Sequence, residues 1–429
     1  MSTPQGQNDL VEVFKTLSAN EQCSFISRKE SDCMTLQLQS GEAEIFGARL
    51  ELNKVYSFSA GYCFSVFTYS GCNLRLQLQQ SETVPFSQRN DMMMFELHLH
   101  TVVEELRERA DVKDERGPIV MIVGPKDAGK STFSTILLNY AVRMQTKRTP
   151  VFVDTDPGQS SLTLPGTIGA ALISDQIQPD KKLSEQVNPL IYNIGSTRLG
   201  VNPLYKQLIS KLAATVLDRL KSNKTAKSSG LIINTPGWTQ NEGFEIIRHT
   251  AQAFEVDVIF VLYQKTLFDA LRHGLPNFVK LVQLPRLEGV RSRSMELRWE
   301  LRDKMLKDYF YGPNNELKPY IFDVDWSSIK VFKVWSSKHV GKSYLGVPEF
   351  DTSLRNKILA VTFAQNKEDA LESNISGFVC LADVIDSRER KVTLLSPFPP
   401  PLADVCLLLT SLFLTSYSVP NSELPSNSI

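Results

Sequence analysis

The most informative stretch of the chain is Gly124-Pro125-Lys126-Asp127-Ala128-Gly129-Lys130-Ser131-Thr132, which matches the phosphate-binding pattern G-x-x-x-x-G-K-[ST]. An apolar run at residues 119–123 precedes it, and a run with apolar residues at helical spacing, 131–144, follows it. In this order of strand, glycine turn and helix, successive backbone N–H groups and the N-terminus of the helix point at one phosphate group. The sequence therefore predicts a nucleotide-binding loop.

Each residue type in this loop has a physical reason to be there. Gly124 and Gly129 permit the turn of the backbone. We expect the ammonium of Lys130 to reach between the β- and γ-phosphates of ATP, and the hydroxyl of Ser131 to complete one corner of an octahedral Mg²⁺ shell. The nucleotide contacts predicted for the loop are Gly124, Asp127, Ala128, Gly129, Lys130, Ser131 and Thr132.

The segments around the loop alternate between buried strands and amphipathic helices. Strands are expected at 119–123, 151–153, 230–234 and 256–262, and helices at 131–144 and 204–220. This alternation is typical of a doubly wound parallel sheet with helices on its faces. It predicts a central P-loop NTPase domain at residues 111–312.

Both flanks of this domain read as β-structure. Residues 20–100 alternate apolar and polar residues, as in Leu74-Arg75-Leu76-Gln77-Leu78, and predict an N-terminal β-sandwich at 1–110. A helix at 97–109, with Leu99, Val102, Val103 and Leu106 on its apolar face, and a charged linker at 111–117 are expected to follow. Short β runs return after Gly312 and predict a C-terminal β-rich domain at 313–429. With the central domain of alternating strands and helices between two β-rich flanks, the predicted fold class is α/β.

Composition excludes several classes of protein. The chain has 429 residues, 42% of them hydrophobic, and 47 basic against 47 acidic residues, which are values of an ordinary globular protein with zero formal charge. The overall charge indicates neither a nucleic acid nor a membrane, so any basic site must be local. The apolar run at 402–417 contains Asp404 and is shorter than the roughly 20 residues of a spanning helix. Without a C-x-x-C pair or a secretory signal pattern, we expect an intracellular protein with no membrane partner.

Two aspartates follow the strand at 151–153 and are candidates for the second catalytic group. Asp154 and Asp156 point the same way in an extended strand, so either could reach Mg²⁺ or a nucleophile beside the phosphate loop. The alternative is an ordinary acidic turn, since Asp-Pro-Gly is common turn chemistry.

A basic segment could supply a lid over the phosphates. It contains Arg286, Arg291, Arg293, Arg298, Arg302, Lys304 and Lys307. Guanidinium groups suit the charge of a phosphoryl group in transfer, and a mobile lid can deliver them. A solvated helix is the competing interpretation, because Glu296, Glu300 and Asp303 could pair with these bases. In the loops after other strands, Trp238 could stack on a base or could only anchor the loop.

Taken together, these features resemble the eukaryotic polyribonucleotide 5′-hydroxyl kinases that are subunits of pre-mRNA cleavage complex II and associate with the tRNA splicing endonuclease. The resemblance covers almost the whole chain. Beyond the phosphate loop, the matching motifs are Glu42-Ala43-Glu44-Ile45-Phe46-Gly47, Asn53-Lys54, Asp156-x-Gly158-Gln159, Pro165-Gly166-Thr167, Gly195-Ser196-Thr197, Ile233-Asn234-Thr235-x-Gly237-Trp238, Tyr309-Phe310-Tyr311-Gly312 and Ser376-Gly377-Phe378.

The resemblance implies roles for individual residues. Lys130 would hold the phosphates, Asp156 would orient or deprotonate the RNA 5′-hydroxyl, and Arg293 and Arg298 match the lid arginines. Ser131 and Asp156 are the implied Mg²⁺ ligands. Trp238 falls where the family stacks the terminal base, with Gln159 and Thr197 near the RNA. Gln22 and Cys63 occupy positions of the first domain that cover the nucleotide.

Several residues depart from the family pattern. Gln22 stands where an acid is usual, Cys63 where a lysine is usual, and Tyr263 where an acid is usual; Pro157 and Pro236 are also unusual. These changes concern adenine recognition and base selectivity rather than the phosphate and metal chemistry.

The resemblance implies an ATP- and Mg²⁺-dependent RNA 5′-hydroxyl kinase of mRNA 3′-end processing and tRNA splicing, located in the nucleus. Its expected partners are RNA with a 5′-hydroxyl end, subunits of pre-mRNA cleavage complex II and the tRNA splicing endonuclease. An alternative is a catalytically weak, ATP-bound scaffold subunit of the cleavage machinery. The presence of Lys130, Ser131, Asp156, Arg293 and Arg298 favours catalysis over the scaffold. A related nucleolar kinase of ribosomal RNA processing fits the length less well.

Overall fold

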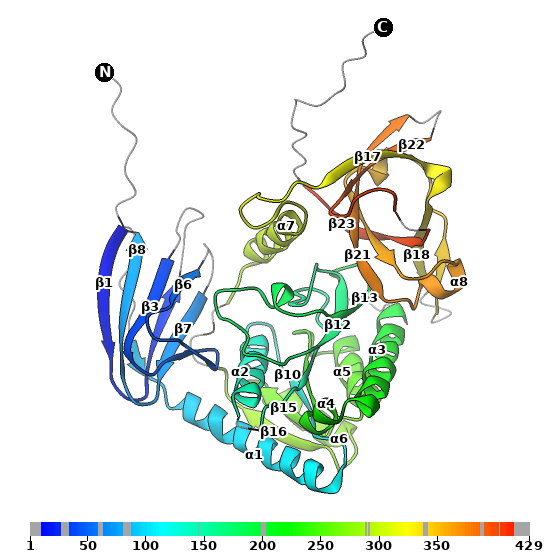
Figure 1. The fold of residues 1–429 in the computed structure, drawn as a ribbon. Coiled ribbons are helices and arrows are strands. Elements are labelled where there is room, and N and C mark those ends of the chain that lie inside the picture. Colours follow the sequence, from blue (N-terminus) through cyan, green and yellow to red (C-terminus); the bar gives the residue numbers. More distant parts are fainter. Residues whose placement is uncertain are drawn as a thin grey trace, which may run out of the picture. The chain divides into compact units, whose positions relative to one another are not determined.

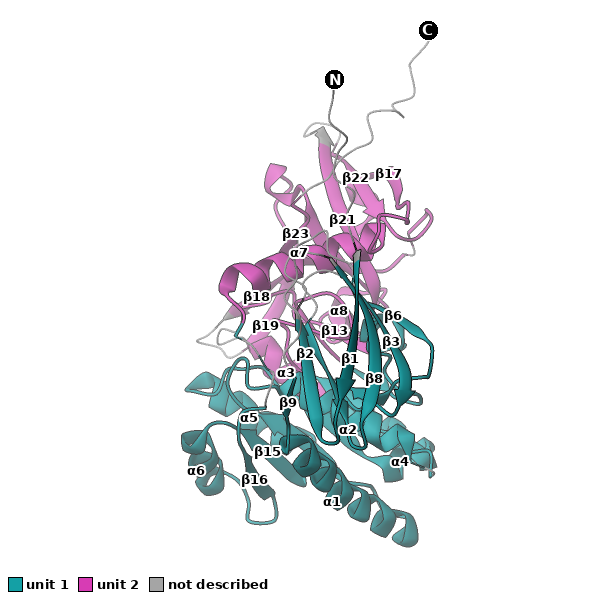
Figure 2. Cartoon of the chain, turned by 90° about the vertical axis from the view of Figure 1, so that its left-hand side faces the viewer, with its two compact units in different colours: residues 1–154, 170–189, 213–292 teal, residues 155–169, 190–212, 293–429 magenta. Residues whose placement is uncertain are grey.

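The computed structural model of the chain describes residues 10–26, 34–58, 63–79, 87–144, 146–198, 203–287, 290, 292–337, 342–386, 390–402 and 404–415. The chain consists of two compact units, which are coloured separately in Figure 2. Unit 1 comprises residues 1–154, 170–189 and 213–292, and unit 2 comprises residues 155–169, 190–212 and 293–429.

Unit 1 begins with a β-sandwich, drawn in blue in Figure 1. One sheet has the order β1-β8-β3-β6 and the other the order β5-β4-β7-β2-β9, and neighbouring strands in both run antiparallel. Alternate side chains such as Leu36, Leu74 and Leu76 are buried between the sheets, as the period-two pattern predicts. The strands are β1 (Leu10–Leu17), β2 (Glu21–Ile26), β3 (Met34–Gly41), β4 (Glu44–Ile45), β5 (Ala48–Arg49), β6 (Val55–Phe58), β7 (Cys63–Thr68), β8 (Cys72–Gln79) and β9 (Ser87–Arg89).

The phosphate loop of unit 1 belongs to a parallel sheet. Its strands pair in the order β11-β14-β10-β15-β16, and every residue of the central strand β10 is buried, as expected for a strand covered on both faces. The carboxyl ends of parallel strands share one edge, so the loops after β10 and β14 leave the sheet side by side. The strands are β10 (Ile119–Val123), β11 (Val151–Asp154), β14 (Leu231–Asn234), β15 (Val258–Leu262) and β16 (Lys280–Leu284).

Helices surround this sheet. They are α1 (Met92–Lys113), α2 (Lys130–Arg143), α4 (Lys224–Ser229), α5 (Glu242–Ala253) and α6 (Lys265–Gly274), with the short helix η1 (Leu183–Glu185). Strand β12 (Thr167–Leu172) and helix α3 (Pro203–Ser222) cross the boundary between the units.

Helix α1 corrects two predictions. It continues to Lys113, so the expected linker begins inside the helix. Its predicted apolar face is only partly right: Leu99 and Val103 are buried, but Val102 is 45% exposed. The face that is buried also carries the charged residues Glu104 and Arg107.

Buried ionic contacts explain this orientation of α1. Arg107 pairs with Glu104 at 3.1 Å and donates to the carbonyl of Ser229 at 2.9 Å. Arg148 Nε pairs with the same glutamate at 2.6 Å. Because the charges satisfy one another, the helix can bury them against the rest of unit 1.

Unit 2 contains a β-rich domain, which confirms the fold class predicted for the C-terminal part. Its sheet has the order β17-β22-β21-β20-β23-β18-β19, around a core that includes Trp326, Leu359, Val379 and Leu394. Its elements are α7 (Met295–Tyr311), β17 (Tyr320–Asp325), η2 (Trp326–Ser328), β18 (Lys330–Ser337), β19 (Lys342–Gly346), η3 (Thr352–Leu354), β20 (Lys357–Thr362), α8 (Lys367–Ala370), β21 (Ile375–Asp386), β22 (Lys391–Ser396) and β23 (Cys406–Phe413); β13 (Leu190–Asn193) also lies in unit 2.

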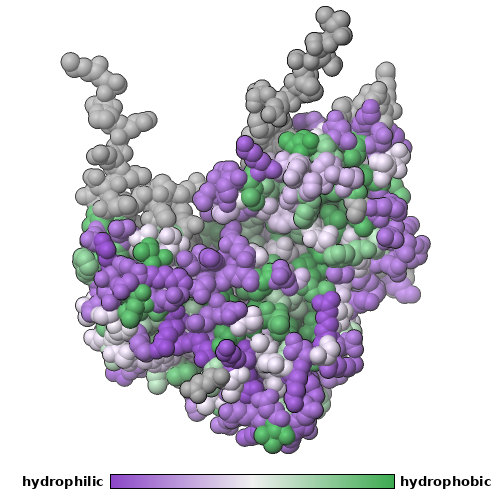
Figure 3. All heavy atoms as spheres, viewed as in Figure 1, coloured by the Kyte–Doolittle hydropathy of each residue, from purple (hydrophilic) through white to green (hydrophobic). Residues whose placement is uncertain are grey.

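The apolar run near the C-terminus forms β23, whose Leu407 and Leu408 are core residues. Among the helices that the structure describes, none combines the length and the apolar character needed to cross a membrane. The face shown in Figure 3 carries mostly hydrophilic side chains, with hydrophobic ones in small groups between them.

Candidate functional site

The predicted phosphate loop is formed by the turn between β10 and α2. Gly129, the residue before the helix, has φ +99°, a conformation that favours glycine. A Cβ atom there would lie 2.8 Å from Cδ1 of Leu287, so the space is closed as well. The loop backbone therefore depends on glycine at this position for two separate reasons.

Lys130 lies at the first position of α2 and is 7% exposed. Its ammonium donates to the carbonyl oxygens of Gly124, at 3.0 Å, and Pro125, at 2.8 Å. Ser131, next in the helix, is exposed. The first turn of α2 contains no acidic residue and its N-cap makes no side-chain hydrogen bond, so the helix N-terminus retains its attraction for an anion. These features fit a phosphate group.

Two neighbouring loops support the phosphate loop. Arg286 Nε donates to the carbonyl of Asp127 at 3.1 Å. A Cβ atom on Gly237 would lie 2.6 Å from the backbone nitrogen of Lys126, so the loop after β14 lies directly against the phosphate loop. Sequence reasoning had placed Arg286 only in the basic segment, and no local signal indicated that it holds this backbone.

The two candidate aspartates have different surroundings. Asp154 is 1% exposed and accepts a hydrogen bond from Nδ2 of Asn234 at 3.0 Å. These two residues are direct partners at the ends of β11 and β14. Asp156 is half-buried, and its Oδ1 accepts from the backbone N–H of Gly158 at 2.8 Å. Asp154 is thus an internal link of the sheet, whereas Asp156 lies on the turn that follows.

Unit 2 places Asp156 among arginines of helix α7. Burial lowers the pKa of Arg302, the neighbouring Arg298 lowers it further, and Asp156 opposes both effects. The three charges therefore lie within range of one another. The resemblance implies a role for Arg298 but none for Arg302, although the spacing of four residues places both on one face of a helix.

The start of α7 holds the other lid arginine. Nη1 of Arg293 donates to Oε1 of Gln159 at 3.2 Å, which joins the lid segment to the turn after Asp156. Nε of Arg298 donates to the carbonyl of Arg293 at 3.3 Å. Of the ion pairs expected for a solvated helix, Lys307 with Asp303 forms at 2.8 Å. Arg291 lies outside the described residues.

The remaining RNA-binding candidates are partly buried. Trp238 follows β14, and a Cβ atom on Gly243 would lie 2.6 Å from its Cγ, so the side chain lies over the start of α5. Thr197 lies in unit 2, where its carbonyl oxygen would be 3.7 Å from a Cβ on Gly158. The structure thus groups Thr197 with the Asp156 turn.

The candidates in the β-sandwich differ from one another. Gln22 is 4% exposed, accepts a hydrogen bond from Nδ2 of Asn90 and donates to Oγ of Ser24 at 3.3 Å. Its amide is thus engaged inside the sandwich. Cys63, at the start of β7, is exposed. Tyr263, the departure after β15, is 64% exposed.

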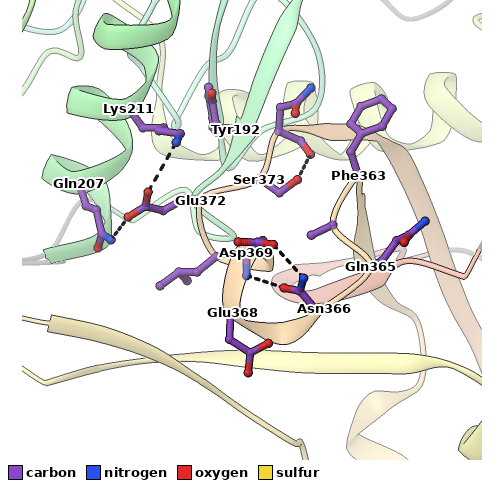
Figure 4. A pocket seen from close by; sticks show the side chains of 13 residues that line it. Tyr192, Gln207, Lys211, Phe363, Gln365, Asn366, Glu368, Asp369, Glu372 and Ser373 are labelled. Atoms are coloured by element: carbon purple, nitrogen blue, oxygen red, sulfur yellow. Dashed lines mark hydrogen bonds and ion pairs between the residues drawn. The ribbon is translucent and has the colours of Figure 1, made fainter.

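A separate cavity of about 760 Å³ lies in unit 2, between α3 and residues 363–374 (Figure 4). Glu372 accepts a hydrogen bond from Gln207 and lies 3.8 Å from the ammonium of Lys211. The predicted site residues do not line it. Within the described part of the chain, no group of three or more His, Cys, Asp and Glu side chains could hold a metal ion.

Comparisons with known proteins match most of the chain. Three family models match: "N-terminal beta-sandwich domain of polyadenylation factor" at residues 16–110, "mRNA cleavage and polyadenylation factor CLP1 P-loop" at 124–312, and "Pre-mRNA cleavage complex II protein Clp1" at 317–414. Among solved structures, that of the wild-type Clp1p-Pcf11p (454–563) complex matches with a TM-score of 0.83 and 25% identity, over 95% of this chain and 99% of that one.

Curated relatives are similar over most of their length. The protein CLP1 homolog of Anopheles gambiae is 40% identical over 410 residues, which is 92% of this chain and 96% of that protein. The polyribonucleotide 5′-hydroxyl-kinase Clp1 of Gallus gallus is 39% identical over 393 residues, which is 88% of this chain and 91% of that protein. On these matches, the chain belongs to the Clp1 family of mRNA cleavage and polyadenylation factors.

Proposed function

We propose that this chain is an ATP-dependent RNA 5′-hydroxyl kinase. The 5′-oxygen of the RNA forms a bond to the γ-phosphorus of ATP, the bond from that phosphorus to the β,γ-bridging oxygen breaks, and the hydroxyl proton passes to a base. The products are ADP and 5′-phosphorylated RNA. Relatives that share 39% of their residues with this chain carry the name polyribonucleotide 5′-hydroxyl-kinase, which supports the proposal.

The phosphate loop is suited to holding ATP. The ammonium of Lys130 rests against two loop carbonyls, close to the backbone N–H groups that open α2, and can turn from them to the phosphates. Ser131 presents an exposed hydroxyl beside it. Bound Mg²⁺, with Ser131 and Asp156 as its proposed protein ligands, would neutralise charge on the phosphate oxygens.

The grouping of Asp156 with Arg298 and Arg302 carries the proposal. This grouping brings a carboxylate on a turn beside a pair of guanidinium groups. In phosphoryl transfer, a carboxylate orients or deprotonates the attacking hydroxyl, and arginines stabilise charge on the phosphoryl group. Asp156 is the proposed base and Arg298 the proposed stabilising group, with Arg293 beside it.

Residues near the Asp156 turn suit the RNA end. Gln159 is joined to Arg293, and the backbone of Thr197 lies close to Gly158. We propose that both contact the first nucleotide and that its base stacks on Trp238, since aromatic side chains are the usual platforms for unpaired bases. Gln22 and Cys63 remain the proposed residues over the adenine.

The family membership supports a role of this reaction in RNA processing. We propose that the chain acts in pre-mRNA 3′-end cleavage and in tRNA splicing, in the nucleus, together with cleavage complex II subunits and the tRNA splicing endonuclease. Support for a cleavage-factor partner comes from the solved relative, which is a complex of Clp1p with Pcf11p.

A transfer assay tests the proposal. The chain is incubated with γ-labelled ATP, Mg²⁺ and a 5′-hydroxyl oligoribonucleotide, and label on the RNA is measured. Lys130→Ala should lower transfer about 10²- to 10³-fold, because the ammonium stabilises charge on the phosphates. Lys126→Ala, at an exposed position of the same loop, is the matched control and should keep most of the activity.

Two results would contradict the proposal. Labelling that survives Lys130→Ala would show that the phosphate loop is not the site. ATP binding by the wild type without any transfer would favour the alternative, a scaffold that holds ATP as a structural ligand.

A further inference from the structure

The first two turns of α7 leave an apolar face uncovered. Met295, Trp299, Leu306 and Phe310 follow one stripe of the helix at spacings of four, seven and four residues. Leu306 and Phe310 are buried, at 4% and 0% exposure, whereas Trp299 is 51% and Met295 82% exposed. The same stripe is therefore core in the second half of α7 and open surface in the first half.

The two sides of this open stripe carry charges of opposite sign. Arg298 and Arg302 lie on one side of Trp299 by helical spacing, and Glu296 and Glu300 lie on the other. Arg302 is the nearer arginine, three residues from Trp299 and therefore its neighbour on the helix surface. An elongated ligand with anionic groups along one side would fit such a surface.

The arginine side leads to the proposed reacting end. Arg302 and Arg298 share the electrostatic surroundings of Asp156, and Arg293 contacts Gln159. Arg298 and Arg302 bring two guanidinium groups beside the carboxylate of Asp156, so the net charge of these three side chains is positive and suits an anion. An RNA whose 5′-hydroxyl is at Asp156 would bring its next phosphates to this side of α7.

We infer that Trp299 and Arg302 form a second nucleotide subsite, in which a base following the 5′-terminal nucleotide stacks on the Trp299 indole and its phosphate pairs with Arg302. The inference rests on the proposed function for the identity of the strand. Stacking needs an accessible aromatic face, and Trp299 has about half of its surface free. The ligand class is single-stranded RNA longer than one nucleotide.

The experiment uses the full-length protein. It separates the effect of RNA length on binding from the effect of a substitution on phosphoryl transfer. Equilibrium binding of 3′-fluorescein-labelled 5′-hydroxyl oligoadenylates of two and eight nucleotides is measured with a non-hydrolysable ATP analogue. KM is measured in parallel for adenosine 3′-phosphate and for the unlabelled octamer. Trp299→Ala should weaken octamer binding about 5- to 150-fold and raise its KM, while the KM of adenosine 3′-phosphate stays unchanged. Trp299→Phe should retain most of the affinity because it keeps an aromatic face.

A second tryptophan supplies the control. Trp335, on β18, is 45% exposed, so Trp335→Ala removes a comparable side chain elsewhere in unit 2 and should leave both affinities unchanged. Equal thermal unfolding of the two alanine variants checks that neither effect is loss of fold.

The outcomes distinguish this inference from the proposed function. If Trp299→Ala binds the octamer like the wild type, or loses the mononucleotide equally, the inference is wrong, and the open stripe is left to a protein partner. A wild type that binds no octamer also overturns it. If the wild type transfers no phosphate but Trp299→Ala still weakens octamer binding, the proposed function fails and the subsite stands.

Discussion

The carboxylate of Glu44 lies 2.6 Å from Nη1 of Arg143, which joins the N-terminal β-sandwich to the helix that begins at the phosphate loop. The hydroxyl of Tyr140 donates to the same carboxylate at 2.6 Å. Burial and Glu44 raise the pKa of Tyr140, so its hydroxyl stays protonated and remains a donor. The sandwich is thus attached to α2 through a buried charge.

Removing that charge should be costly. Glu44 is 3% exposed, and Glu44→Ala leaves Arg143 and Tyr140 without their shared acceptor, so we expect a loss of about 3–5 kcal/mol in the free energy of unfolding. Urea unfolding followed by fluorescence measures it. Glu42→Ala removes a glutamate of the exposed pair with Arg49 and should cost less than about 1 kcal/mol. Similar losses in both variants would contradict this account of Glu44.

The stability of the chain should depend on pH through His100. The pKa of this side chain is lowered from 6.5 to about 4, mainly by burial; Arg107 and Arg143 contribute to the lowering, and Glu104 opposes it. Both of its ring nitrogens lack a hydrogen-bond partner among the described residues. The folded state therefore holds the neutral ring, and the unfolded state binds more protons between the two pKa values. The contribution is complete above pH 6.5 and falls as the pH drops toward 4.

We expect His100 to account for about 2 kcal/mol of lost stability at pH 5 relative to pH 7.5. His100→Phe keeps a ring against Tyr140 and should flatten the pH dependence of the unfolding midpoint over this range. The same substitution at exposed His98 on α1 is the matched control. An unchanged slope in His100→Phe would show that other groups govern acid sensitivity.

Substitution of Asp154, the last residue of β11, and of Asp156, on the turn after it, should have different effects. Asp156→Asn should lower kcat about 10²- to 10⁴-fold and change the KM for ATP little, because it removes the proposed base. Asp154→Asn replaces the carboxylate that accepts from Asn234 inside the sheet by a neutral amide, which weakens this charge-assisted hydrogen bond and should lower the unfolding temperature. Steady-state kinetics and thermal unfolding of both variants give the answer; a catalytic loss confined to Asp154→Asn would reverse the assignment.

Lid arginines should affect the transfer step more than ATP binding. Arg298→Ala should lower kcat about 10³-fold or more, as expected for an arginine that stabilises a phosphoryl group. Lys304→Ala removes an exposed cation of the same helix and should leave kcat near the wild-type value. Single-turnover rates at saturating ATP separate the two effects. Equal rates for the two variants would remove Arg298 from the reaction.

The contact between two loops of unit 1 should be needed for nucleotide binding. In Gly237→Ala, the new Cβ would lie 2.6 Å from the backbone nitrogen of Lys126, so the phosphate loop must shift. We expect at least a tenfold weaker Kd for ATP, measured by calorimetry. Gly274→Ala, whose Cβ would be 3.3 Å from the ring of Phe244, is the control and should bind ATP normally. Normal binding by Gly237→Ala would show that the loops move independently.

Some elements of the fold could be predicted from patterns of neighbouring residues in the sequence. The glycine spacing, the apolar run before it and the helical run after it predicted β10, the phosphate loop and α2, because each depends on neighbouring residues. Period-two alternation predicted the sandwich, and the resemblance predicted the family. The domain boundaries and the roles of the individual site residues stay predictions.

Other features needed the folded chain. The burial of Arg107 depends on Glu104 nearby but also on Ser229, which lies far along the sequence. Asp154 and Asp156 look alike in the sequence, and only the pairing of β11 with β14 distinguishes them by giving Asp154 the amide of Asn234. Likewise, Arg286 contacts the phosphate loop at Asp127, which lies 159 residues away in the sequence.

The amino-acid sequence by itself determined the kind of chemistry, since glycine, lysine, aspartate and arginine at these spacings suit phosphate groups. Tertiary structure decided which of several similar charged side chains are buried links and which stay available. The reason is physical: the free energy of a charge depends on its burial and its partners, and those partners come from distant parts of the chain.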